Sequence, residues 1–241
     1  MRAEARHQLK EDRFSKATFG AAENAVHWTL EHQSKLIAAA LAVIVIAAIG
    51  VGGWYYLNLQ DEKASAEFST ATRTMETPVR PTGVPAQPGY ETFASLQERA
   101  TAARKQFQAI VDKYPHTRTA LMARYFVGLN AAQTGDYSAA ENNLRQVNEA
   151  RNKDLAALAK LALASVYRSE NKDSQVPDLY RQLIDKPTPT VSKVAAQLEL
   201  ASFYESRQKP DEAKRIYDQI QKEDVGTEAA AIAQQRANEL K

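Results

Sequence analysis

Residues 120–144 decide the fold, and they read ALMARYFVGLNAAQTGDYSAAENNL. Small and aromatic residues stand at fixed points around a turn: Gly128, Gly135, Asp136, Tyr137, Ala140, Leu144 and Val147. The second copy of this pattern contains Leu163, Ala164, Tyr167, Asn171, Val176, Tyr180 and Leu183. The third copy contains Leu200, Ala201, Tyr204, Gln208, Ala213, Tyr217 and Ile220. The steps from Gly128 to Ala164 and from Ala164 to Ala201 are 36 and 37 residues.

Each copy predicts two packed helices with a turn between them. The small residue lets the first helix approach its neighbour, and the bulky residue of the second helix fills the gap between copies. Ala103, Phe107, Ile110 and Pro115 form the second half of an earlier copy. The first three of these residues lie 37 positions before Ala140, Leu144 and Val147. A period held over four copies predicts a helical solenoid. The alternative is a plain helical bundle.

The pattern resembles the tetratricopeptide repeat (TPR), whose consensus unit has about 34 residues. Gly128, the Gly135-Asp136-Tyr137 turn and Ala140 match that consensus. The aromatic residue expected at the fourth position is absent, since Arg124, Lys160 and Gln197 stand there. The resemblance implies a TPR-like helical repeat domain over residues 90–241. Thr227–Lys241 would then form the polar capping helix that ends a solenoid.

Residues 36–57 read LIAAALAVIVIAAIGVGGWYYL and contain no charged residue. A helix of this length would span about 33 Å, enough for a hydrocarbon core of about 30 Å. Trp54, Tyr55 and Tyr56 fit an interfacial aromatic belt. We therefore predict a transmembrane helix over 36–57 that is not cleaved, because a signal peptide has a shorter apolar run. The alternative is a buried core helix. The predicted fold class is all-α, with one transmembrane helix followed by a TPR-like α-solenoid.

The flanks of this segment predict its orientation. Six basic residues precede it, at Arg2, Arg6, Lys10, Arg13, Lys16 and Lys35, which favours a cytoplasmic N-terminus. Residues 1–35 would form a cytoplasmic leader, with an amphipathic pre-membrane helix over Ala21–Ser34. In a bacterium with two membranes, the C-terminal domain would be periplasmic and the span would lie in the inner (plasma) membrane.

Two further segments separate the membrane span from the repeats. Residues 58–77 are predicted to form a juxtamembrane helix, with Ala64, Phe68, Ala71 and Met75 at helical spacing. Residues 78–89 contain four prolines and two glycines, which break any helix. We interpret them as a Pro-rich linker.

In TPR arrays the first helix of each pair lines the concave, ligand-binding face. The corresponding residues form our predicted protein-binding set: Met122, Tyr125, Leu129, Gln133, Leu158, Leu161, Ser165, Arg168, Leu198, Ser202 and Glu205. TPR domains that clamp a terminal carboxylate carry Asn or Lys at the fifth and ninth positions. Tyr125, Leu161 and Leu198 occupy the fifth position here, which favours an apolar contact strip over a carboxylate clamp. The alternative is that these side chains pack against neighbouring helices.

The residues offer little for catalysis. There is no cysteine, and His116 is the one histidine beyond the N-terminal segment. No P-loop or GxGxxG is present, and a net charge of +2 makes no electrostatic case for nucleic acid. We therefore expect no enzyme activity, no cofactor, no metal and no small-molecule substrate.

The layout resembles the ancillary SecYEG translocon subunit (YfgM-like) family of single-span membrane proteins. The resemblance rests on Val26–Glu31, on Lys35, on the Gly53-Trp54 exit from the span, and on Lys63–Glu67 after it. It implies a non-enzymatic scaffold beside the Sec translocon, whose partners are translocon subunits, periplasmic chaperones or secreted clients. The Pro-rich insertion and the long leader depart from the pattern. The alternative is a TPR component of another envelope machine, in cell-division coordination or outer-membrane assembly.

Overall fold

The computed structural model describes residues 32–240, and in this range the regular structure is helical apart from one isolated β-bridge. The predicted all-α fold is confirmed. The amphipathic helix predicted over Ala21–Ser34 lies outside the described residues except for its last positions. The helices are α2 (Gln33–Glu76), α3 (Leu96–Lys113), α4 (Arg118–Gln133), α5 (Tyr137–Asn148), α6 (Lys153–Ser169), α7 (Val176–Asp185), α8 (Lys193–Ser206), α9 (Pro210–Glu223) and α10 (Glu228–Glu239).

The chain divides into two units, Met1–Leu57 and Asn58–Lys241. The described part of the first unit is the N-terminal part of α2, and every residue from 33 to 57 is exposed. Within the described range, α2 is the helix that is long and apolar enough to cross a membrane. The large aliphatic side chains of this stretch are therefore open to solvent, as judged over the described residues.

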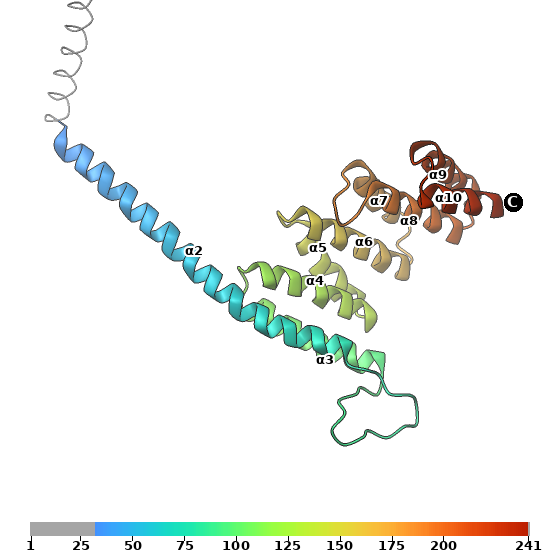
Figure 1. Cartoon of the computed structure of the whole chain (residues 1–241), viewed down its shortest axis with the longest axis horizontal. Coiled ribbons are helices and arrows are strands. Elements are labelled where there is room, and N and C mark those ends of the chain that lie inside the picture. The colour runs from blue at the N-terminus through green and yellow to red at the C-terminus, as the bar shows by residue number, and fades with distance from the viewer. Residues whose placement is uncertain (1–31, 241) are drawn as a thin grey trace, which may run out of the picture. The chain divides into compact units, whose positions relative to one another are not determined.

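In the second unit, successive helices pack in pairs (Figure 1). The pairs α4–α5, α6–α7 and α8–α9 correspond to the three copies of the sequence pattern. We call the first helix of each pair helix A and the second helix B. Helix α10 packs against α9, where the capping helix was predicted.

The turn from helix A to helix B has the same geometry in all three pairs. Gly135, Asn171 and Gln208 adopt left-handed φ angles of 81°, 57° and 56°. The amide after each of them donates to a carbonyl five residues earlier, at 2.8–2.9 Å. These bonds close Schellman motifs, which end helix A and turn the chain back.

The core runs along the contact between helices A and B. Gly128, Ala164 and Ala201 are buried at equivalent positions of α4, α6 and α8. Leu144, Leu183 and Ile220, from helices B, are also buried. Each pair thus buries a small residue of helix A and a bulky residue of helix B, and in the α4–α5 pair the bulky Leu144 meets Gly128 within the pair as well as packing in the core cluster shared with α6.

Residues 58–76 of α2 form the helix A of a further pair, with α3 as its helix B. Ala64 and Ala71 are completely buried in one cluster with residues of α3 and α4. The ring of Phe68 lies 5.2 Å from that of Phe107 on α3 and 5.6 Å from that of Phe126 on α4. The sequence-based division separates this helix from the repeat domain, whereas its side chains pack within the repeat array. The Pro-rich segment is therefore an insertion between helix A and helix B of the first pair.

Candidate protein-interaction surface

The predicted binding residues belong to three A helices, and we call them the A-helix strip. On α4 they are Met122, Tyr125, Leu129 and Gln133. On α6 they are Leu158, Leu161, Ser165 and Arg168, and on α8 they are Leu198, Ser202 and Glu205.

The apolar members of the strip are partly open to solvent. Met122 is 43% exposed, and the others are half-buried. Tyr125, Leu158 and Leu161 pack with one side against the same core cluster, although they come from two helices. Leu198 packs instead against the cluster around α9 and α10. The structure thus places Tyr125 of α4 on the same core cluster as Leu158 and Leu161 of α6, while Leu198 packs on a separate part of the core.

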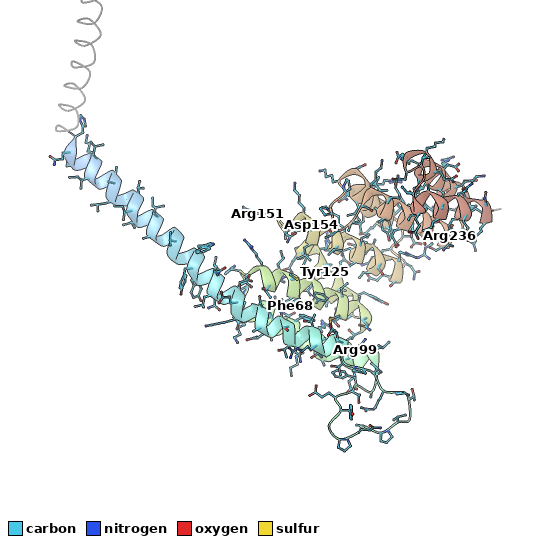
Figure 2. All side chains as sticks on the ribbon, viewed as in Figure 1. Phe68, Arg99, Tyr125, Arg151, Asp154 and Arg236 are labelled. Atoms are coloured by element: carbon cyan, nitrogen blue, oxygen red, sulfur yellow. The ribbon has the colours of Figure 1, made fainter. Side chains whose placement is uncertain are left out.

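Tyr125 is the aromatic member of the strip (Figure 2). Its ring meets that of Phe126 edge-on, with the centroids 5.5 Å apart. Burial raises the pKa of Tyr125, because the phenolate would be poorly solvated there. The side chain therefore stays neutral at physiological pH and combines an apolar ring with a hydroxyl group. Such side chains often anchor protein interfaces.

The polar members fall into two groups. Gln133, Ser165 and Ser202 are exposed. Glu205 is engaged within the domain, because it accepts a hydrogen bond from the Tyr217 hydroxyl at 3.0 Å and lies 4.0 Å from Arg236. Glu205 therefore ties α8 to α9 and α10, which limits what it can offer to a partner.

Arg168, the other charged member, is also engaged. Its side chain hydrogen-bonds to Tyr180 on α7, whose pKa is nevertheless raised, chiefly by burial. With Glu205 engaged by other helices, what the strip offers to a partner is apolar contact area, neutral hydrogen-bonding groups and the half-buried guanidinium of Arg168.

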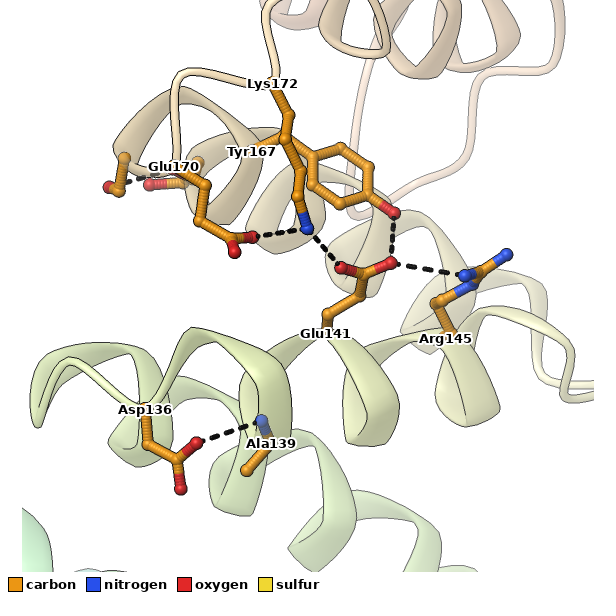
Figure 3. Close-up of polar contacts among 9 residues, drawn as sticks. Asp136, Ala139, Glu141, Arg145, Tyr167, Glu170 and Lys172 are labelled. Carbon is orange, nitrogen blue, oxygen red and sulfur yellow. Dashed lines mark hydrogen bonds and ion pairs between the residues drawn. The ribbon is translucent and has the colours of Figure 1, made fainter.

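A charged cluster lies on the helix B side, where α5 meets the turn between α6 and α7 (Figure 3). Glu141 accepts hydrogen bonds from Lys172 at 2.9 Å and from the Tyr167 hydroxyl at 3.1 Å, and it pairs with Arg145 at 3.2 Å. Lys172 also pairs with Glu170 at 3.0 Å. The Lys172 ammonium lowers the pKa of Glu141, and the two carboxylates raise the pKa of Lys172. These charges satisfy one another and join neighbouring repeats.

The described residues show no arrangement suited to metal binding: between 32 and 240, no group of three or more His, Cys, Asp or Glu could hold an ion. His116 is exposed in the turn before α4.

Sequence reasoning did not assign Phe68 to the register of the strip. Phe68, Tyr125, Leu161 and Leu198 occupy equivalent positions, because Phe68 precedes the buried Ala71 by three residues as Tyr125 precedes Gly128. The signal was present in this local spacing. The Pro-rich insertion hides it, because the step from Ala71 to Gly128 is 57 residues instead of 36 or 37.

Comparisons with known proteins agree with this architecture. Two crystal structures of nearly identical TPR-like repeats, from a Podosopora anserina protein described as a kinesin light chain, superpose with a TM-score of 0.54. They are 15% and 14% identical, and the alignments cover 75% of this chain and 85% and 86% of those chains. At this identity the likeness concerns the fold. Comparison with curated protein sequences gives no match.

A family model, described as a tetratricopeptide repeat-like domain, matches residues 26–175. The match begins before the apolar segment and ends within the third of the four helix pairs. TPR-like folds typically serve as non-enzymatic scaffolds for protein binding. On this match, the chain belongs to the tetratricopeptide repeat-like domain family.

Proposed function

We propose that this protein is a membrane-anchored scaffold that binds polypeptide through the A-helix strip, next to the Sec translocon. Residues 36–57 cross the membrane, the N-terminus is cytoplasmic, and residues 58–241 act in the periplasm. The observation that carries the proposal is the composition of α2. One helix contains the charge-free exposed stretch 36–57 and, from Ala64 onward, the first helix of the repeat array.

The membrane anchor is supported by exposure as well as by length. A helix that is apolar on every side is normally buried in a large protein core or in lipid. The aliphatic side chains from Leu36 to Val51 are exposed, and so are Trp54, Tyr55 and Tyr56, by 60–67%. Leaving this much apolar surface in water would be costly. A lipid bilayer removes that cost and gives the aromatic residues an interfacial position.

The range of the family match is a second support. It covers the apolar stretch, the first helix pair and the Pro-rich insertion in addition to later repeats. The apolar helix is therefore part of what this chain shares with the family, which fits an anchor better than an incidental extension.

We propose the Sec translocon as a partner because the layout of the chain resembles the YfgM-like family. The apolar residues of the A-helix strip support the proposal that the clients are unfolded polypeptides. A polypeptide that emerges from a translocon is extended and has not yet buried its apolar side chains. Met122, Tyr125 and Leu161, which are exposed or half-buried, offer such a chain apolar contacts.

The topology is tested by proteolysis of the full-length protein in spheroplasts. Protease added outside should degrade residues 58–241 and leave a tag at Met1 intact. A protected C-terminal domain, or a mature protein that begins after residue 57, would refute the anchor.

The binding surface is tested by photocrosslinking from Gln133, which is exposed on the strip. We expect adducts with secreted clients or periplasmic chaperones, and adducts with translocon subunits when the crosslinker stands at Ala48 in the span. Met122→Asp should abolish the adducts at Gln133. The matched control is Leu96→Asp, because Leu96 is 55% exposed but lies on α3, away from the strip.

Both variants should keep the unfolding midpoint of the wild type, since both positions are exposed. Equal crosslinking yields for Met122→Asp and the wild type would refute the proposal that the A-helix strip binds polypeptide. Adducts with division or outer-membrane assembly proteins instead of translocon subunits would favour the alternative envelope machine.

A further inference from the structure

The Pro-rich insertion is a closed loop that projects from the first helix pair. Val79 and Phe93 form a β-bridge at its base, where the Arg80 amide donates to the Phe93 carbonyl and the Phe93 amide to the Pro78 carbonyl, both at 3.0 Å. Arg99 on α3 donates to the Thr77 carbonyl at 3.1 Å and fixes the base to the domain. The loop therefore leaves and re-enters the array at one point, unlike a linker between separate domains.

Two turns shape the loop beyond its base. The Val84 amide donates to the Pro81 carbonyl at 3.1 Å, and the Tyr90 amide donates to the Gln87 carbonyl at 3.2 Å. Gly83 and Gly89, the third residues of these turns, have φ angles of 85° and 84°. This geometry is that of type II turns, which require a positive φ at the third position.

From Val84 to Pro88, the second residue of the second turn, the chain favours an extended conformation. Pro85 and Pro88 have φ fixed near −65°. Val84 and Gln87 each precede a proline, which disfavours helical angles and favours polyproline II. The structure shows no regular secondary structure from 84 to 87. In a polyproline II helix, with three residues per turn, Pro85 and Pro88 lie on the same edge, about 9 Å apart.

The loop presents this edge to solvent. Every residue from 81 to 91 is exposed, and Val84 and Tyr90 are exposed by 43% and 74%. No charged residue occurs from 81 to 90. Arg80, the nearest cation, donates to the Thr92 carbonyl at 3.4 Å in the base of the loop.

We propose that the loop is a recognition element that docks Pro85 and Pro88 into an uncharged, aromatic-lined groove of a partner protein. Grooves of this type bind paired prolines three residues apart, because the polyproline II segment is already ordered and its ring faces stack on aromatic side chains. The closed base and the two turns reduce the conformational entropy that binding would cost. This interaction is independent of the A-helix strip and of the client that the strip binds.

The test uses the full-length protein in its native membrane, with a photocrosslinking residue at Ala86. This position lies between the two prolines and off their shared edge. We expect one protein to be crosslinked, with the attachment site beside aromatic residues of a groove. The purified partner should bind the full-length protein, and Pro85→Ala/Pro88→Ala should weaken that affinity about tenfold or more.

The matched control is Pro81→Ala, which removes a proline of the same loop outside the pair and should retain the affinity. Both variants should keep the unfolding midpoint of the wild type, because the substituted side chains are exposed. Crosslinks to lipid alone, to another copy of this chain alone, or to nothing would overturn the proposal. Unchanged affinity of the double variant would also overturn it.

Discussion

The carboxylate of Asp61 accepts a hydrogen bond from the backbone amide of Thr119 at 2.9 Å, across 58 positions of the chain. This bond joins the helix that follows the apolar segment to the first turn of α4. Glu67, less than two turns further along, accepts from Lys113 at 2.6 Å and from the Tyr114 hydroxyl at 2.8 Å, and these bonds lower the pKa of Glu67. Polar bonds thus supplement the apolar contacts of Ala64 and Ala71 and fix residues 58–76 in the repeat array.

Asp61→Ala should lower the free energy of unfolding of the 58–241 fragment by about 0.5–2 kcal/mol, as the loss of a helix cap does. The substitution leaves the Thr119 amide without its acceptor and removes a negative charge from the N-terminus of α4. Urea denaturation measures the change. Glu62→Ala is the control, because Glu62 is adjacent but exposed. Equal losses in the two variants would mean that the bond contributes nothing specific.

Gly128→Ala should destabilise the domain by about 1–3 kcal/mol, the range for overpacking a core. A Cβ atom at Gly128 would lie 2.7 Å from the Cγ and 2.9 Å from the Cδ2 of Leu144, whose side chain is completely buried. Alanine favours helix by about 1 kcal/mol over glycine, so a net loss would show that the clash dominates.

The control for this clash is a double-mutant cycle with Leu144→Ala, which makes room for the added methyl group. The double variant should be more stable than the sum of the two single changes predicts. If the two changes in the free energy of unfolding simply add, the destabilisation by Gly128→Ala does not arise from contact with Leu144.

Gln208→Gly should stabilise the domain by about 0.5–1 kcal/mol, after the greater entropy of glycine in the unfolded chain is included. Gln208 has a φ of 56°, in the left-handed region where a Cβ atom is unfavourable. The equivalent turn position of the first sequence copy is Gly135, with a φ of 81°. Gly135→Ala should therefore shift the thermal midpoint in the opposite direction. A lower midpoint for Gln208→Gly would mean that the side chain, and not the backbone, decides stability there.

The charged cluster around Glu141 predicts that the stability of the fold depends on pH in the acidic range. Lys172 holds the pKa of folded Glu141 below the ordinary value of 4.5. The pairing therefore stabilises the fold fully above that value, and this contribution is lost as the pH falls through the lower pKa of the folded state. Glu141→Gln should be less stable than the wild type at pH 7, and the difference should shrink as the pH falls below 4.5. A difference that stays constant down to low pH would contradict the pairing. Carboxyl chemical shifts would give the pKa of Glu141 directly.

The sequence alone determines the features that depend on local spacing. Gly128, Ala164 and Ala201 recur at steps of 36 and 37 residues because each helix pair must bring its two helices into close contact with the same small residue. The turns at Gly135 and Asn171 use residues that tolerate a left-handed backbone. The run from Leu36 to Leu57 can be identified as a long, charge-free apolar helix without any tertiary information.

Tertiary structure decides which segments pack together and which side chains remain available. Ala64 and Ala71 belong to the array because their helix packs on α3 and α4, across an insertion that hides the period. Glu205 has the register of a binding residue, yet Tyr217 and Arg236 engage it from other helices. Leu198 has the register of Leu161 but packs on a different core cluster. Sequence spacing gives the face of one helix, whereas the contacts of a side chain depend on residues brought near it from elsewhere in the chain.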